Sequence, residues 1–204
     1  MGEVLMSTAY CGPAAYYSCA LQHTKVIVEQ YEYFPKQSYR NRCELMGANG
    51  KLSLSIPLRE RKNKSLTKEI IIDYKTDWQT QHWRTIESAY RNSPFYEYYC
   101  DELQGPFFEK IDSLIEYNRL LQEEILLQIG LTIPFQYSED YTANGNTRLM
   151  DARNLFNPKT QSALKFSEYV QVFDQKFGFM PNLSILDLLF NLGNETEQYL
   201  KSIG

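Results

Sequence analysis

Residues 3–30 carry the pattern of a strand, a turn, a helix and a second strand, and this pattern constrains the fold more than any other. Residues 3–10 favour a strand, Gly12-Pro13 breaks it, residues 14–23 favour a helix, and residues 25–30 (KVIVEQ) are rich in β-branched side chains. Together these elements have the length of a βαβ unit. Ligands bind such units at the carboxyl ends of the strands, so the loop Tyr10-Cys11-Gly12-Pro13 is a candidate binding loop. The loop lacks the GxGxxG fingerprint of dinucleotide-binding proteins.

The rest of the chain predicts a hairpin followed mainly by helices. Asn49-Gly50 lies between strand-like residues 42–46 and 51–57, which is a hairpin signal, and residues 69–74 favour another strand. Ser93-Pro94 is a typical start of a helix. The further predicted elements are helices at 78–92, 107–129, 148–156, 184–192 and 194–202, and a last strand at 169–173.

These patterns predict an α/β fold. We expect the N-terminal βαβ unit and the hairpin strands to form a mixed sheet, with a mostly helical C-terminal half packed on it. The chain has 204 residues, 43% of them hydrophobic, without a repeat or an obvious linker. A single domain over residues 1–204 is therefore expected.

The charge and the hydropathy limit the classes of partner. The net charge of -4 makes a nucleic-acid partner unexpected, so any attraction for phosphate must be local. No signal peptide is visible, and no run approaches the roughly 18 apolar residues of a spanning helix. We expect a cytoplasmic protein that binds a small-molecule substrate and has no stable membrane insertion. The sequence leaves its oligomeric state open.

The cysteines and histidines do not form a metal-binding pattern. The chain has two histidines and four cysteines, and no cysteine pair has CxxC spacing. We therefore expect no metal site and no cofactor. Free buried thiols are the expected state of Cys11, Cys19, Cys43 and Cys100.

His82 is the residue best suited to acid–base chemistry. On a helix over 78–92 it falls in the apolar stripe with Trp78 and Ile86, so its ring points inward. Two interpretations stay open: a neutral ring packed in the core with one hydrogen-bond partner, or the acid or base of a pocket. Arg91 can share a site with His82 only if the helix ends before Arg91, which Ser93-Pro94 allows.

Two other groups of polar residues stand out. Arg40 and Arg42 flank Asn41 with strand spacing, so on a strand both would reach one face and suit phosphate or carboxylate. The alternative is a solvated edge or a salt bridge. Asp187 matches a capping box with Ser184 and lies one turn before Asn191, which indicates either a buried polar contact or a ligand-facing strip.

Several motifs together resemble the WbqC-like protein family, and they span nearly the whole chain in one order. The motifs are Tyr10-Cys11-Gly12-Pro13, Ser38-Tyr39-Arg40-Asn41-Arg42, Asp73 followed by Trp78 and His82-Trp83, Ser88-Ala89-Tyr90-Arg91-Asn92-Ser93-Pro94-Phe95, and Pro181 to Gly193 (PNLSILDLLFNLG). The amino end departs from the commoner pattern, in which Gln-Pro precedes Tyr-Phe-Pro and a tryptophan. Here the segment reads YCGPAAYYS.

The resemblance implies a link to bacterial surface polysaccharides such as O-antigen, and two hypotheses follow. The first is a transferase that moves an acyl or aminoacyl group, such as glycyl, onto a sugar that can bear phosphate. His82 would then act as the base, and Asp73 would orient it. The second is a non-catalytic binding or scaffolding protein of a polysaccharide assembly pathway. The substrate-binding residues of the first hypothesis are Tyr10, Tyr39, Arg40, Asn41, Arg42 and Arg91.

Overall fold

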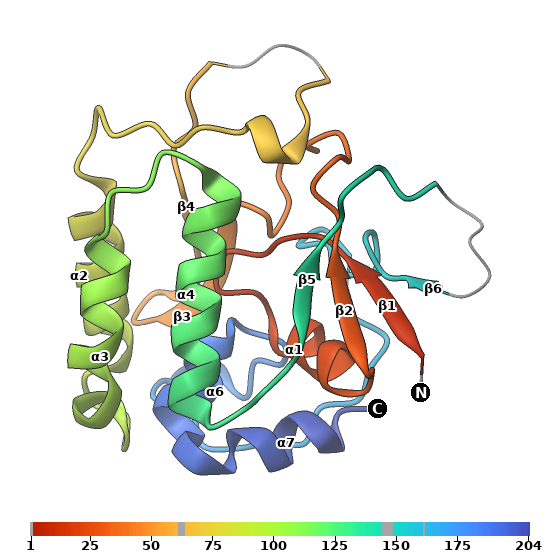
Figure 1. Cartoon of the computed structure of the whole chain (residues 1–204). Helices are drawn as coiled ribbons and strands as arrows, with labels where there is room; N and C mark the ends of the chain where they lie inside the picture. The colour runs from red at the N-terminus through yellow and green to blue at the C-terminus, as the bar shows by residue number, and fades with distance from the viewer. Residues whose placement is uncertain (1, 61–63, 144–148, 161) are drawn as a thin grey trace.

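A four-stranded parallel sheet organises the computed structural model, which describes residues 2–60, 64–143, 149–160 and 162–204. The strand order is β5-β2-β1-β6, and each neighbouring pair is parallel (Figure 1). The strands are β1 (Glu3–Met6), β2 (Lys25–Val28), β5 (Phe135–Tyr137) and β6 (Leu149–Asp151). The chain moves outward from β1 to β2 and β5, and then returns to the other side of β1 as β6. The sheet therefore has a topological switch point between β1 and β6.

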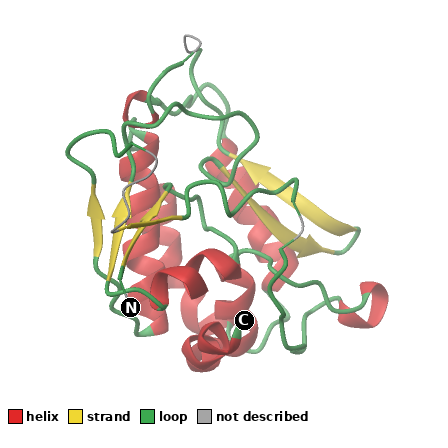
Figure 2. Cartoon of the chain, turned by 90° about the vertical axis from the view of Figure 1, so that its right-hand side faces the viewer, coloured by secondary structure: helices red, strands yellow, loops and turns green. Residues whose placement is uncertain are grey.

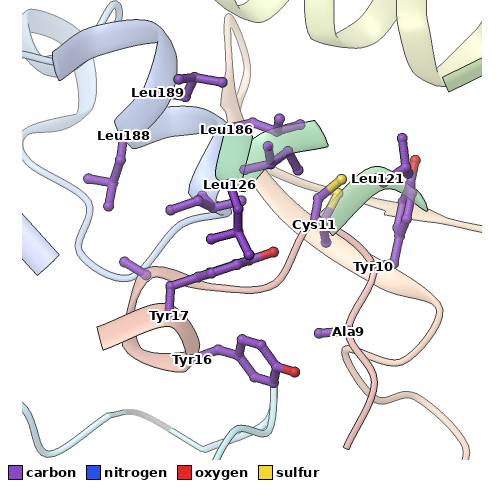
Figure 3. Packing of buried hydrophobic residues seen from close by; sticks show 14 of the residues in the cluster. Ala9, Tyr10, Cys11, Tyr16, Tyr17, Leu121, Leu126, Leu186, Leu188 and Leu189 are labelled. Atoms are coloured by element: carbon purple, nitrogen blue, oxygen red, sulfur yellow. The ribbon is translucent and has the colours of Figure 1, made fainter. Parts of the chain in front are cut away.

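The predicted βαβ unit is confirmed. Helix α1 (Ala14–Leu21) connects β1 to β2, and it contacts the carboxy-terminal helices α6 (Ile185–Leu192) and α7 (Thr196–Ser202). Leu186, Leu188 and Leu189 of α6 are buried in the same core as the residues after β1 (Figure 3). This packing stabilises α1 through tertiary contacts, which a helix of only eight residues requires.

The predicted hairpin forms a sheet of its own. Strands β3 (Arg42–Gly47) and β4 (Gly50–Ser55) pair antiparallel, separate from the parallel sheet (Figure 2). Cys43 and Leu54 are paired and buried. The α/β class is confirmed, with the hairpin packed against α2 (Trp78–Tyr90) rather than joined to the parallel strands.

The helix predicted over 107–129 is wrong in its first part, because the chain breaks there. Helix α3 (Tyr96–Phe108) ends, and α4 (Leu114–Ile129) begins after a short turn. Gln79 donates hydrogen bonds to the carbonyls of Phe107 and Glu109, at 2.8 and 2.9 Å. These bonds satisfy carbonyl groups that a continuous helix would have used.

Three other local predictions are also wrong. The strand predicted at 69–74 is absent: Glu69 ends a 3-10 turn, η1 (Thr67–Glu69), and residues 70–74 form only isolated bridges. The strand β6 lies where a helix at 148–156 was predicted, and residue 148 is outside the described residues. Residues 169–173 are not a strand, because side chains rather than a ladder hold this segment, as described below.

The remaining short elements complete the carboxy-terminal half. They are α5 (Asp174–Phe177) and η2 (Gly193–Glu195), which joins α6 to α7. Over the residues that the structure describes, no helix combines the length and the apolar composition that are needed to span a bilayer.

We expect Gly193→Ala to destabilise the fold. Gly193 has φ +56°, and a Cβ atom there would lie 2.7 Å from the Phe95 ring. The change should lower the unfolding free energy by about 1–3 kcal/mol in chemical denaturation. Gly105→Ala in α3 is the matched control, because a Cβ there meets nothing within 4 Å. It should raise stability by up to about 1 kcal/mol; equal stability of the two variants would contradict the packing described.

Candidate functional site

Charged and polar side chains follow the strands of the parallel sheet, where each strand ends. Ser7 follows β1, Glu29 and Glu32 follow β2, Ser138 follows β5, and Arg153 follows β6. They are between 0% and 9% exposed, although all of them are polar or ionisable. Charged residues are almost never this buried unless they are paired. We call the following residues the carboxyl-edge cluster: Ser7, Glu29, Glu32, Arg40, Ser138, Asp151 and Arg153.

Arg40 and Glu32 form a buried ion pair with two parallel hydrogen bonds. The Arg40 Nε atom lies 2.7 Å from Glu32 Oε1, and Nη2 lies 2.8 Å from Oε2. Arg40 also donates to the Ser7 hydroxyl, which in turn donates to the Arg153 carbonyl at 3.3 Å. This chain of bonds connects the ends of β2, β1 and β6.

Arg153 forms the second ion pair of the cluster. Its Nε and Nη2 atoms lie 2.9 and 2.6 Å from the two carboxylate oxygens of Asp151, and this contact lowers the pKa of Asp151. The Arg153 Nη1 atom lies 3.8 Å from Glu29, which is fully buried. Glu29 also accepts hydrogen bonds from the Ser138 hydroxyl and the Thr142 amide, at 2.9 and 2.7 Å.

The cluster holds two guanidinium groups and three carboxylates, so its formal charge is one negative. Both guanidinium groups are already ion-paired. A bound phosphate would have to compete with Glu32 or Asp151 for them. The cluster therefore suits a neutral or amine-bearing ligand better than an anion.

A cavity of about 490 Å³ opens on this cluster. This volume is in the range of small-molecule sites. Tyr33 and Tyr141 are 62% and 55% exposed at the cavity, so their rings are accessible to a ligand. We call this cavity the carboxyl-edge pocket; its lining residues are Tyr31, Glu32, Tyr33, Leu66, Tyr141, Arg153 and Asn154.

The predicted binding loop after β1 is closed by the protein itself. The amides of Ala14 and Ala15, at the start of α1, donate to the Leu183 carbonyl and to Asn182 Oδ1, both at 2.9 Å. These are amides that bind phosphate in nucleotide-binding βα turns. Cys11 is buried among core side chains (Figure 3), and burial raises the pKa of its thiol to about 12. Its thiol therefore favours the protonated form at neutral pH.

His82 is a buried ring with defined partners. It is 7% exposed, its Nδ1 atom lies 2.9 Å from the Tyr10 hydroxyl, and its ring centroid lies 5.1 Å from that of Trp78. Burial lowers the pKa of His82 to about 4, partly offset by a hydrogen bond to the Ser55 backbone. The ring is neutral at pH 7. The packing interpretation accounts for this geometry, and the catalytic role of His82 stays a prediction.

The other predicted site residues lie in different surroundings. Asp73 accepts a hydrogen bond from the Lys75 amide at 3.0 Å and lies 4.0 Å from the Lys75 ammonium group. Asn41 donates to the Ile56 carbonyl, and Arg91 is an exposed residue at the end of α2. Their roles in binding or catalysis stay predictions.

The predicted arginine pair does not share a strand face. Arg42 begins β3, whereas Arg40 precedes the strand and turns inward to Glu32. Tyr39 donates from its hydroxyl to Glu44, at 3.0 Å, and lines a second cavity. Arg40 is thus the predicted site residue that lies in the carboxyl-edge cluster.

Sequence reasoning missed the acidic partners and Arg153. The rule that ligands bind at the carboxyl ends of parallel strands could have pointed to Glu29, near the end of the strand predicted at 25–30, and to Glu32 shortly after it. No such signal marked Asp151 and Arg153, because β6 was not predicted.

Comparisons with known proteins identify a family. The model of the WbqC-like protein family matches residues 9–160, which include every member of the carboxyl-edge cluster except Ser7. An uncharacterized protein of Mycobacterium tuberculosis (strain ATCC 25618 / H37Rv), Rv1507c, is 26% identical over 205 residues, covering 86% of this chain and 87% of its own length. No solved structure matches the chain significantly.

We expect Arg40→Met to destabilise the protein strongly. The change leaves the Glu32 carboxylate buried without its partner, which costs about 3–5 kcal/mol of unfolding free energy. Adding Glu32→Gln should recover much of this loss in chemical denaturation. Arg59→Met is the control, because the Arg59–Asp112 pair is more than half exposed and should contribute little. A double variant that loses the sum of the single losses would contradict a coupled pair.

The burial of His82 predicts a pH dependence of stability. Its folded pKa of about 4 lies below the ordinary 6.5, so the unfolded chain binds more protons between these pH values. The parent should lose up to about 3 kcal/mol of unfolding free energy through this group as the pH falls from 7 to 4. His82→Gln should lack this contribution, and its stability should be compared with the parent at both pH values. His23→Gln controls for the removal of a histidine elsewhere; a constant difference between parent and His82→Gln would refute a buried neutral ring.

Proposed function

Because the chain belongs to the WbqC-like protein family, we propose that it is a transferase that moves an acyl or aminoacyl group onto a sugar in surface-polysaccharide biosynthesis. The sugar binds in the carboxyl-edge pocket. One observation carries the proposal: the Glu32 carboxylate, held by Arg40, lines a cavity beside exposed tyrosine rings.

The lining of the pocket suits a sugar. A sugar ring has apolar C–H faces and a rim of hydroxyl groups. Tyr33 and Tyr141 offer aromatic faces to the C–H faces of the sugar. Glu32 and Asn154 offer hydrogen-bond acceptors and donors to its hydroxyl groups. The negative formal charge of the cluster favours a neutral sugar or an amino sugar over a sugar phosphate at this position.

Acyl transfer needs a base for the attacking group. The sugar hydroxyl or amine attacks the acyl carbonyl carbon, a new C–O or C–N bond forms, and the attacking group releases a proton. Glu32 is the pocket carboxylate that can accept this proton. The bond to the leaving group then breaks, and the leaving group keeps the electron pair. His82, the base predicted from the sequence, is packed against Tyr10 and Trp78, so the geometry favours Glu32.

The alternative is a non-catalytic binding or scaffolding protein of a polysaccharide assembly pathway. The burial of His82 favours this alternative, because a scaffold needs no accessible base. Both functions share the sugar site, and turnover of a bound sugar with an acyl donor separates them.

Sugar binding tests the proposal. In isothermal titration, glucosamine should bind more tightly than glucose, and glucose more tightly than glucose 1-phosphate. Tyr141→Ala should weaken glucosamine binding about tenfold, because it removes one aromatic face. Tyr98→Ala on α3 is the matched control, since Tyr98 is an exposed tyrosine on another element. Absence of sugar binding, or equal weakening by both variants, would sink the proposal.

A further inference from the structure

We propose that a second cavity, of about 510 Å³, is a nucleotide-binding site. It lies between the β3–β4 hairpin and the segments at 158–160, 162–168 and 179–182. Nucleotide binding stands on this cavity alone. A role of this cavity in binding the activated acyl or aminoacyl donor of the transferase rests on the proposed function.

The second cavity and the carboxyl-edge pocket flank the same two segments of chain. At 39–40, Tyr39 lines the second cavity, whereas Arg40 holds Glu32 of the carboxyl-edge pocket. At 153–160, Arg153 and Asn154 line the carboxyl-edge pocket, whereas residues 158–160 line the second cavity. No lining residue is common to the two cavities, but residues adjacent in sequence line one and then the other.

The side chains of the second cavity match the parts of a nucleotide. Phe166 and Phe179 offer aromatic faces, and bases of any kind stack on such rings. Glu44 offers a carboxylate, which is the group that commonly accepts hydrogen bonds from ribose hydroxyls. Lys159 supplies an ammonium group for phosphate, and Lys51 supplies a second one, which phosphate would share with Glu44.

Glu44 is held in a fixed orientation. The buried Tyr39 donates from its hydroxyl to Glu44 Oε2 at 3.0 Å, and the Lys51 ammonium group lies 2.8 Å from the same atom. Burial and the nearby Glu44 carboxylate raise the pKa of Tyr39, which keeps its hydroxyl a donor at neutral pH. Glu44 Oε1 forms neither of these two bonds, so it can accept one from a ligand.

Asp187 does not line the second cavity, but its hydrogen bonds support a residue that does. It is 1% exposed on α6, and it accepts hydrogen bonds from the Tyr169 hydroxyl at 2.5 Å and from Gln171 at 2.9 Å. Gln171 also bonds both backbone groups of Met180, at 2.8 and 3.0 Å. Met180 lines the cavity, so the wall is preformed by side-chain hydrogen bonds. Asp187 acts as a positioning residue, in the buried polar contact that its spacing to Asn191 indicated.

Isothermal titration of the full chain with UMP, AMP, uridine and adenosine tests the site. We expect both nucleotides to bind, and each nucleoside to bind at least threefold more weakly than its nucleotide. Phe166→Ala should weaken nucleotide binding at least tenfold through the loss of stacking. Lys51→Met should reduce the difference between nucleotide and nucleoside. Tyr141→Ala, in the carboxyl-edge pocket, should leave nucleotide binding unchanged.

Several results would overturn the nucleotide site. They are the absence of binding of UMP and AMP at millimolar concentration, unchanged binding in both cavity variants, or loss of binding in Tyr141→Ala. If Phe166→Ala fails to fold by circular dichroism, Lys51→Met decides the question alone, because its side chain is 44% exposed. If sugars do not bind but nucleotides do, the proposed function is wrong and the nucleotide site stands. If sugars bind but nucleotides do not, only the nucleotide site is wrong.

Discussion

Arg40 donates two charge-assisted hydrogen bonds to Glu32 in a largely buried pair, and the arrangement of the sheet edge depends on this pair. Removing two charges from water is expensive, so the pair persists only because its geometry and its further hydrogen bonds are favourable. Asn118 of α4 donates to the Arg40 carbonyl at 2.8 Å, and Arg40 donates to Ser7 after β1. Through its side chain and its backbone carbonyl, Arg40 thus connects elements that are distant in sequence, and its guanidinium group holds Glu32 at the wall of the pocket.

The parts of the fold that local sequence encodes could be predicted. The βαβ unit and the hairpin have their own periodicity and turn residues, so they were identified without any long-range information. Strands β5 and β6 have three residues each, and their pairing partners lie more than 100 residues away, which leaves no local pattern. The break before α4 was missed for a related reason: Gln79, which stabilises it, belongs to another helix.

The candidate site, too, could be predicted only where its residues are close in sequence. The density of donors around Arg40 marked a polar centre, but its partners follow different strands and meet only in the folded sheet. The helical wheel correctly predicted that the His82 side chain points inward. It could not predict which side chains of other elements the ring would contact. The Tyr10 hydroxyl and the Trp78 ring occupy that space. The spacing of Asp187 and Asn191 indicated a buried polar contact, whereas Tyr169 and Gln171 had to be seen in space.

The pairing of β6 with β1 has a consequence for co-translational folding. The Ser7–Arg153 bond spans 146 positions in sequence, so the chain must be synthesised as far as Arg153 before the sheet can be completed. Closing so long a loop early is entropically unfavourable, whereas the β1–α1–β2 unit can form from neighbouring residues. The nascent chain is therefore expected to hold Glu29 and Glu32 without Arg153 until β6 has been synthesised, and the pocket becomes complete only then.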